Sequence, residues 1–132
     1  MKTIEELREF FKADIFATDA GCVIEEAGKG VSVCSMPIEA KHKNARGAVM
    51  GGAIFTLADF AFAVAANAEG IPTVSVSANT MFMKAAKGTK LIARAELIHN
   101  GRTTCAASVR IKDDLGTNIA EVSLTGIHLA QG

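Results

Sequence analysis

Apolar side chains recur at helical spacing in two parts of the chain. Near its start, Thr3 and Glu6 are the ends of a capping box, and one helical face then carries Ile4, Leu7, Phe10 and Phe11. We therefore expect an amphipathic helix within residues 1–14. A longer helix is predicted over residues 50–68. It is apolar nearly all round, a pattern typical of a helix that is buried on nearly every side.

The other apolar segments have the length and composition of β-strands. Predicted strands cover residues 22–27 and 31–38 before the long helix, and residues 73–85, 90–99, 102–112 and 117–129 after it. Short turns separate them, of which Asn100-Gly101 is the strongest hairpin signal. Because the last four strands follow one another through such turns, we expect a five- to six-stranded antiparallel sheet wrapped around the long helix. Residues 1–132 are then a single α+β domain.

The strand after the long helix alternates strictly. Its polar positions are Thr73, Ser75, Ser77 and Asn79, and its apolar positions are Val74, Val76 and Ala78. Because successive side chains of a strand point to opposite faces, the apolar set faces outward if the polar set faces Asp59 on the helix. One sheet cannot cover a helix that is apolar all round, so the pattern predicts an obligate homodimer. The outward apolar face predicts that two dimers associate into a homotetramer.

Composition and charge exclude several classes of protein. The 132 residues are 49% hydrophobic, far too apolar for a disordered chain. Fourteen Lys and Arg balance fourteen Asp and Glu, and basic residues form no aromatic-rich stripe, so we expect no nucleic-acid partner. The long apolar segment contains a charge, Asp59, and strands follow it. Both features favour a buried helix over a membrane span. Three widely spaced cysteines and an acidic start of the chain predict reduced thiols and a cytoplasmic protein.

One carboxylate, Asp59, interrupts the long apolar helix. Its neighbours one turn away are Phe55, Thr56, Phe62 and Ala63. One interpretation is structural: Asp59 faces the wet edge of the helix or bonds Thr56. The other is functional: it is a reactive carboxylate in an apolar pocket, where desolvation tunes its basicity.

Glycines lie where the same helix begins. Gly47 and the pair Gly51-Gly52 would let a ligand approach the free N–H groups of the first turn, which suit an anion or a polarised carbonyl. Gly51 and Asp59 are eight residues apart, which is about 12 Å along a helix. One small carbonyl group cannot touch both on one helix. We therefore expect Gly51 of one chain and Asp59 of its partner to share a site.

These residues resemble the motif of hot-dog thioesterases of the phenylacetic-acid-degradation (PaaI-like) type, in the 4-hydroxybenzoyl-CoA thioesterase superfamily. The matching positions, at the family's spacing, are Asn44, Gly47, Gly51-Gly52 and Leu57-Ala58-Asp59. The resemblance extends to residues 74–79 and 100–103 and covers about residues 15–129. It implies the hot-dog fold, in which an antiparallel sheet wraps a long helix, and hydrolysis of an acyl-CoA thioester. Family members are dimers, commonly paired into tetramers.

The resemblance also implies roles for four residues. Asp59 matches the catalytic carboxylate, which acts as a nucleophile or as a general base on water. The Gly51 amide matches the group that polarises the thioester carbonyl. Asn44 matches a residue that positions the thioester or the water, and Ser75 matches a strand hydroxyl that orients the water. The family usually has His before the two glycines, where this chain has Met50, which cannot donate a hydrogen bond.

Further residues are expected to contact the substrate, a small aromatic or short- to medium-chain acyl-CoA. The candidates are Met50 and Gly52 at the helix start, Phe62 and Phe82 for the acyl group, and Arg46 and Lys84 for the coenzyme A phosphates. We expect no metal and no cofactor, since coenzyme A is part of the substrate. The alternative is a non-catalytic acyl-CoA binding or sensing protein on the same fold, although a binder gains nothing from a carboxylate near the thioester.

Overall fold

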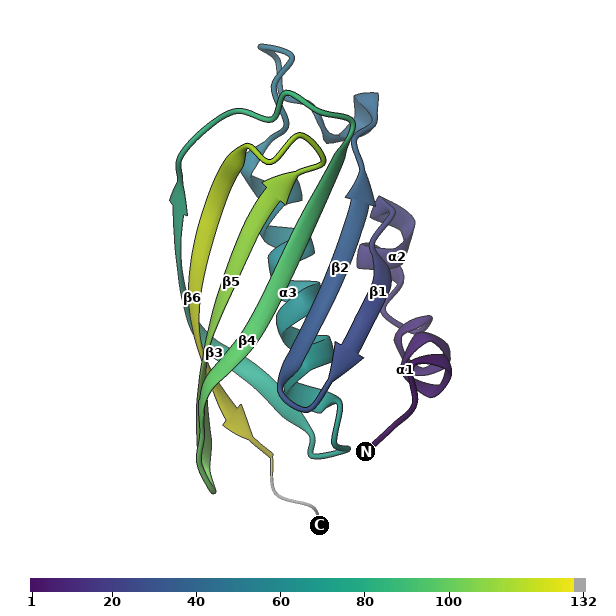
Figure 1. The fold of residues 1–132 in the computed structure, drawn as a ribbon, viewed down its shortest axis with the longest axis vertical. Helices are drawn as coiled ribbons and strands as arrows, with labels where there is room; N and C mark the ends of the chain where they lie inside the picture. Colours follow the sequence, from purple (N-terminus) through teal and green to yellow (C-terminus); the bar gives the residue numbers. More distant parts are fainter. Residues whose placement is uncertain (130–132) are drawn as a thin grey trace.

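The computed structural model describes residues 1–129, which form three helices and six strands (Figure 1). The helices are α1 (Ile4–Phe11), α2 (Ile15–Ala20) and α3 (Gly51–Asn67), with a 3₁₀ turn η1 (Ala40–His42). The strands are β1 (Val23–Gly28), β2 (Val31–Pro37), β3 (Thr73–Phe82), β4 (Lys90–Asn100), β5 (Thr104–Asp113) and β6 (Asn118–His128). Every predicted strand is present, and its ends lie within three residues of the predicted ones. The last three residues of the predicted domain lie outside the described range.

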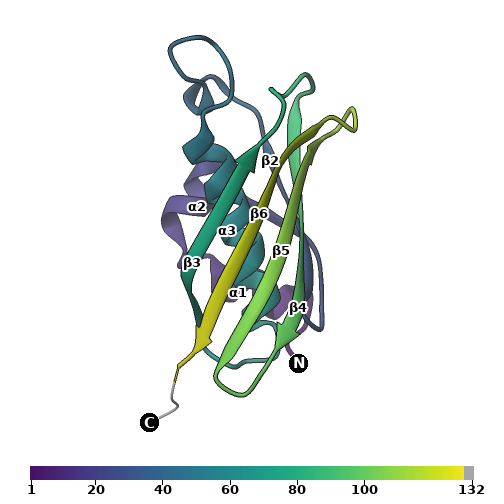
Figure 2. The same cartoon turned by 90° about the vertical axis from the view of Figure 1, so that its left-hand side faces the viewer.

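All six strands belong to one antiparallel sheet in the order β1-β2-β4-β5-β6-β3. The sheet curves around α3, which lies against one of its faces, and α1 and α2 lie beyond β1 (Figures 1 and 2). The predicted α+β class, with a six-stranded sheet wrapped around one long helix, is confirmed.

The predicted hairpin between β3 and β4 is wrong. Strand β3 pairs with β6 at the edge of the sheet, so residues 83–89 cross from that edge to β4 (Figure 1). The turn between β5 and β6 holds this crossing segment. Asp113 accepts hydrogen bonds from the amides of Lys87 and Gly88 at 2.8 and 3.0 Å. Asp114 accepts one from the Thr89 amide at 2.8 Å. Carboxylate-to-backbone bonds therefore take the place of strand pairing here.

The strict alternation predicted for β3 is also wrong, because the strand contains a bulge between Ser75 and Ser77. Paired residues of neighbouring strands share a face of the sheet. Ser75 pairs with Gly126 on the inner face, whereas Ser77 pairs with the exposed Thr125. The extra residue thus turns Ser77 and Asn79 outward and Ala78 inward, so that only the first half of the predicted polar face looks toward α3.

Small side chains let α3 and the sheet approach closely. The buried residues at this contact include Leu57, Ala58, Ala61 and Val64 of α3 and Ala93 and Ala95 of β4. The hydroxyl of Ser32 in β2 donates to the carbonyl of Ala61 at 2.7 Å, which adds a polar bond across the same layer. Within residues 1–129, no helix has the combination of length and apolar character that a membrane crossing requires.

One stripe of α3 is left uncovered by the rest of the chain. It runs through Gly52, Thr56, Asp59 and Ala63, which recur every three or four residues and are all at least partly exposed. In a single chain the helix is therefore buried on three sides and open on the fourth.

The N-terminal helix forms as the capping box predicts. The Glu6 amide donates to Thr3 Oγ1 at 3.1 Å, and the Thr3 amide donates to Glu6 Oε1 at 3.0 Å. Its buried residue Phe11 packs edge-on against Phe60 of α3, with ring centroids 5.6 Å apart. Helix α2 was not predicted, because its six residues are too few to show a helical repeat. It ends at Gly21, whose φ of 106° is the left-handed conformation common after a helix.

Candidate active site

The first turn of α3 leaves backbone donors free. Met50 is the N-cap residue, but its side chain makes no capping bond, and its amide donates to the carbonyl of His42 at 2.8 Å. The first amides that bond within the helix are those of Ala53 and Ile54, both to the Met50 carbonyl. Within residues 1–129, the amides of Gly51 and Gly52 have no acceptor. Two N–H groups at the positive end of a 17-residue helix are thus available to a carbonyl oxygen or an anion.

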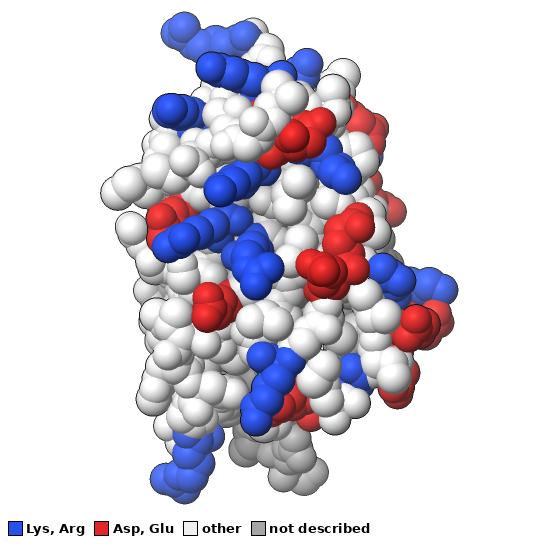
Figure 3. Space-filling model, in the orientation of Figure 1, with Lys and Arg blue, Asp and Glu red and all other residues white. Residues whose placement is uncertain are grey.

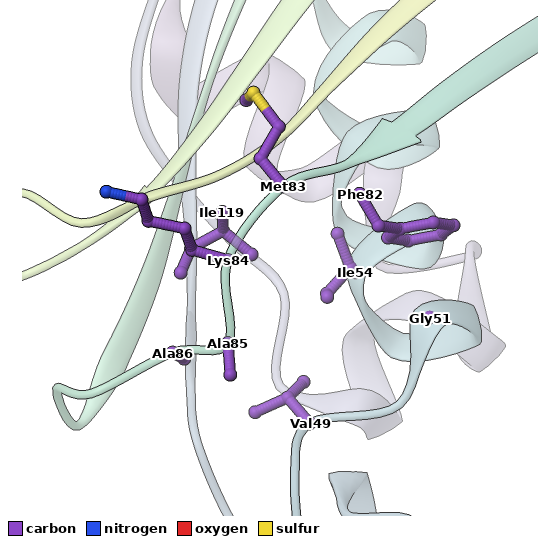
Figure 4. A pocket seen from close by; sticks show the side chains of 9 residues that line it. All are labelled: Val49, Gly51, Ile54, Phe82, Met83, Lys84, Ala85, Ala86 and Ile119. Carbon is purple, nitrogen blue, oxygen red and sulfur yellow. The ribbon is translucent and has the colours of Figure 1, made fainter.

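A cavity of about 340 Å³ opens beside Gly51, between the helix start and the segment that follows β3 (Figure 4). The ring of Phe82, the last residue of β3, forms one wall. A Cβ atom on Gly51 would lie 3.0 Å from Phe82 Cζ, so the ring is already in contact with the glycine backbone. Phe82, one of the predicted substrate contacts, therefore lies directly beside Gly51. Lys84 also lines this cavity, but its side chain extends away from the helix start (Figure 4).

Asp59 lies two turns further along α3, on the open stripe. Desolvation by the surrounding apolar residues raises the pKa of this carboxyl above its ordinary value, and the negative charge of Asp14 raises it further. Thr56 does not bond to it, because the Thr56 hydroxyl donates to the carbonyl of Gly52 at 2.8 Å. Within the described part of the chain, no group donates a hydrogen bond or an ion pair to Asp59. It is a half-buried carboxylate without a partner.

Gly51 and Asp59 belong to one straight helix, so their separation of about 12 Å is fixed by the helical rise. A single thioester carbonyl cannot lie within bonding distance of both in one chain.

Asn44 holds the loop before α3 in place. Its Oδ1 atom accepts hydrogen bonds from the backbone amides of Arg46 and Ala48 at 3.0 and 3.2 Å. The backbone amide of Asn44 donates to the Ala48 carbonyl at 2.8 Å. The side-chain oxygen is thus occupied, whereas Nδ2 has no acceptor within residues 1–129. Asn44 can therefore position a substrate or water only as a donor, and the two bonds to Oδ1 fix the orientation of its side chain.

Ser75 lies on the inner face of β3, as its pairing with Gly126 shows. A Cβ atom on Gly126 would lie 2.9 Å from Phe62 Cζ of α3, so this register position looks directly at the helix. The start of β3 is fixed by Asn67 at the end of α3. Asn67 Oδ1 accepts from the Thr73 amide at 2.9 Å, and its Nδ2 donates to the Thr73 carbonyl at 3.2 Å. The α3–β3 connection thus places Ser75 beside the helix.

A second cavity, of about 640 Å³, lies on the other side of the helix start, and Met50 and Gly52 line it. His42 also lines it, yet it cannot replace the missing family histidine. Its Nδ1 accepts from the Glu39 amide at 2.9 Å, and its Nε2 lies 2.6 Å from the carbonyl of Ala20. Because both ring nitrogens are occupied, His42 is a buried structural residue that joins η1 to α2.

Basic side chains gather at the end of the molecule where α3 begins. Figure 3 shows Lys and Arg concentrated there, over the loop before α3 and the crossing segment, whereas both signs of charge mix elsewhere on this face. The exposed residues of these segments include Lys43, Arg46, Lys84 and Lys87. The two predicted phosphate contacts, Arg46 and Lys84, thus both lie near the helix start but on different segments.

Phe62 does not line either cavity. It is 1% exposed and packs against Gly126 in the core. The sequence prediction put Phe62 in an acyl pocket, whereas in the single chain it is a core residue. Two other residues with a place at the site were missed: Phe16 and Ala20 of α2, which line the larger cavity. The apolar pair Ile15-Phe16, followed by Gly21, is consistent with a short helix. A helix of six residues is too short to show a helical repeat in the sequence.

A six-stranded antiparallel sheet around one long helix, with free glycine amides where that helix begins, is the architecture of the hot-dog thioesterases. The family model described as thioesterase superfamily matches residues 46–120. The chain belongs to this superfamily.

Known proteins place it further within the superfamily. Human acyl-coenzyme A thioesterase 13 is 33% identical over 136 residues, covering 97% of this chain and 91% of that protein. The solved structure of Escherichia coli PaaI, from the phenylacetic acid degradation operon, has a TM-score of 0.88 at 25% identity and covers 92% of this chain and 89% of that one. A hypothetical thioesterase of Streptococcus pneumoniae, solved with coenzyme A, has a TM-score of 0.84 at 27% identity, with 92% and 98% covered. The resemblance to PaaI-like hot-dog thioesterases is confirmed.

Proposed function

We propose that the protein is an acyl-CoA thioesterase, which hydrolyses the thioester to a free acid and coenzyme A. Asp59 is the observation that carries this proposal. A half-buried carboxylate with a raised pKa and no partner destabilises the fold, and catalysis gives it a use. The names of the human and E. coli relatives, and the coenzyme A bound by the S. pneumoniae protein, support the substrate class.

The reaction takes place between two copies of the chain. The thioester carbonyl accepts hydrogen bonds from the free amides of Gly51 and Gly52 in one copy, which stabilise the oxyanion of the tetrahedral intermediate. Asp59 of the other copy takes a proton from the attacking water. Collapse of the intermediate breaks the C–S bond, and the departing thiolate receives that proton. Ser75, on the inner face of β3, orients the water, and Asn44 Nδ2 donates to the substrate. Direct attack by Asp59, followed by hydrolysis of the anhydride, uses the same geometry.

The surface that such a dimer needs is open in the single chain. Strand β3 is an edge strand whose residues 74–79 are all exposed, and it lies next to α3 (Figure 2). Pairing of two β3 edges about a two-fold axis would satisfy their backbone groups and bring the two helices together. Val74 and Val76, 45% and 61% exposed, remain candidates for contact between dimers in a homotetramer. The basic cluster at the α3 start would bind the coenzyme A phosphates.

A thiol-release assay with the Asp59→Asn variant tests the function. We expect kcat to fall by about 10²- to 10⁴-fold, the usual contribution of a positioned acid–base group, while affinity for coenzyme A is kept. The exposed Glu96→Gln variant, on the outer face of β4, is the matched control. Turnover by Asp59→Asn at the control rate would refute the mechanism. If the wild-type protein binds acyl-CoA but releases no thiol from an acyl-CoA of any acyl group, it is the non-catalytic binder.

Mixed dimers test whether the site is shared. Asp59→Asn and Gly51→Pro subunits, each with at most about 1% of the wild-type kcat alone, are refolded together at equal amounts. If the site is shared, each mixed dimer has one intact site, and about a quarter of the wild-type activity returns, since random pairing makes half of the dimers mixed. If each chain contains its own site, no activity returns.

A further inference from the structure

Two cavities flank the first turn of α3. Gly51 lines the smaller one, on the side of β3, and Gly52 lines the larger one, on the side of α2. The two free amides therefore lie between two separate spaces. A thioester carbonyl held by these amides carries two substituents, the acyl group and the pantetheine arm of coenzyme A. The geometry provides one cavity for each.

The larger cavity has an apolar lining at the helix start. Phe16 of α2, Ala53 of α3 and Met50, the residue before the helix, all line it. A Cβ atom on Gly52 would lie 3.3 Å from Met50 Cε, so the thioether is folded over the glycine backbone. The residue that departs from the family motif thus adds apolar surface next to the reacting carbonyl.

The polar side chains around this cavity are already bonded within the chain. Both nitrogens of His42 are occupied, and Lys41 Nζ donates to the carbonyl of Asp19 at 2.8 Å. The Thr56 hydroxyl donates to the carbonyl of Gly52 at 2.8 Å. His42 and Thr56 therefore have no donor left for a hydroxyl or a carboxylate of an occupant. Lys41 keeps two further N–H groups, but Lys41 and Asp19 are both exposed, so water solvates these two opposite charges.

We propose that the cavity between α2 and α3 binds the acyl group, and that it selects an aliphatic chain without hydroxyl or carboxyl substituents. The proposal rests on the proposed function for the position of the thioester. The volume of the α2–α3 cavity, about 640 Å³, lies well within the range of ligand sites, about 300–1,000 Å³. The smaller cavity, which leads past Lys84 and the basic cluster, receives the pantetheine arm. Each methylene buried in the α2–α3 cavity adds about fourfold in affinity, whereas a buried hydroxyl without a partner lowers affinity at least about fivefold.

Calorimetric titration with non-hydrolysable S-alkyl-CoA thioethers tests this assignment without requiring turnover. The probes are S-ethyl-, S-butyl- and S-octyl-CoA, together with S-phenethyl-CoA and its 4-hydroxyphenethyl analogue. The variants are Ala53→Leu, which adds a larger side chain to the lining of the larger cavity, and Ala85→Leu, which adds the same side chain to the lining of the smaller one.

In the wild type we expect affinity to rise from ethyl to octyl and to fall when the phenyl ring carries a hydroxyl. Ala53→Leu removes the gain of about three methylenes, on the order of 50-fold for S-octyl-CoA, and leaves S-ethyl-CoA nearly unchanged. Ala85→Leu keeps the full dependence on chain length. Phe16→Ala, at a side chain that is 77% exposed, weakens octyl binding without any demand on folding.

An unchanged chain-length dependence in both Ala53→Leu and Phe16→Ala would overturn the assignment, as would equal affinity for the two aryl probes. Thiol release measured in parallel separates the two proposals. Chain-length-dependent binding without hydrolysis refutes the thioesterase and supports the cavity assignment. If the protein hydrolyses acyl-CoA but Ala53→Leu does not shift its acyl preference, the thioesterase proposal is supported and the cavity assignment is refuted.

Discussion

Replacing Gly51 by proline removes one hydrogen atom from the proposed oxyanion site while the helix keeps its start. Proline is favoured at the first helical position, because the N–H there has no partner within the helix. The residue before a proline must be extended, and Met50 already is, with φ of −71° and ψ of 149°. We therefore expect Gly51→Pro to fold with a melting temperature close to that of wild type.

The size of the effect follows from what the amide does. The loss of one oxyanion donor lowers kcat by about 10²- to 10³-fold, or about 2.7–4 kcal/mol of transition-state stabilisation. Gly51→Ala is the matched control, since its Cβ meets the same Phe82 ring at 3.0 Å but its N–H is kept. That contact shifts the ring by a few tenths of an ångström, for which we expect a loss of no more than about tenfold.

The assay is steady-state thiol release with the preferred acyl-CoA, alongside circular dichroism and thermal melting of each variant. The reasoning predicts that kcat of Gly51→Pro lies at least about 10²-fold below that of Gly51→Ala, at similar melting temperatures. Equal kcat values in the two folded variants would show that the Gly51 amide does not touch the reacting carbonyl, and the site would have to lie elsewhere.

Three further predictions concern pH and packing. Because Asp59 acts when ionised and desolvation raises its pKa, log kcat/KM should rise with pH through an acid limb above about 3.9, the ordinary value for Asp; the residual activity of Asp59→Asn should lack that limb. Gly126→Ala should destabilise the fold by about 1–3 kcal/mol in urea denaturation, since its Cβ would lie 2.9 Å from both Phe62 Cζ and Cys105 Sγ, whereas Gly52→Ala should not. Burial opposes ionisation of Asp113, but amides of Lys87, Thr117 and Gly88 outweigh it and hold the pKa of Asp113 well below its usual range. The stability that Asp113 adds is thus present at pH 7 and lost as pH falls below about 4, so thermal melting should show Asp113→Asn to be destabilised at neutral pH and the difference from wild type to shrink in acid.

Local sequence patterns predicted the elements of the fold. The capping box of Thr3 and Glu6, the apolar run of α3 and the alternation of β4 each act within a few residues of one another, and each is present. Partners of strands are a different matter, because pairing is set by contacts between distant segments. Nothing within residues 73–90 indicates that β3 pairs with β6, since the information lies in Asp113 and Asp114, which hold the crossing segment from 25 residues away.

The β3 bulge shows a second limit of sequence reasoning. An alternating pattern fixes the face of each residue only while the strand has no extra residue. Val76 is that residue, and it reverses the faces of every later position without any change in composition. The prediction for Ser75 survives because this residue precedes the bulge, whereas the predictions for Ser77, Asn79 and Ala78 do not.

Helices α1 and α3 show where the candidate site differs from ordinary structure. Helix α1 obeys every rule of helix initiation, with a hydroxyl cap, acidic residues in the first turn and no free site. Helix α3 departs from ordinary helix chemistry at three places: Met50 does not cap it, Gly51-Gly52 are weak helix formers, and Asp59 is a single charge in an otherwise apolar helix. Packing of α3 against the sheet provides the stability that these positions lack. The first two exceptions leave backbone donors free, and the third leaves a carboxylate unpaired, so each creates a group that a substrate can use. Such local conflicts within an otherwise consistent sequence are expected at functional sites, and here they fall on the residues of α3 that the proposed mechanism uses.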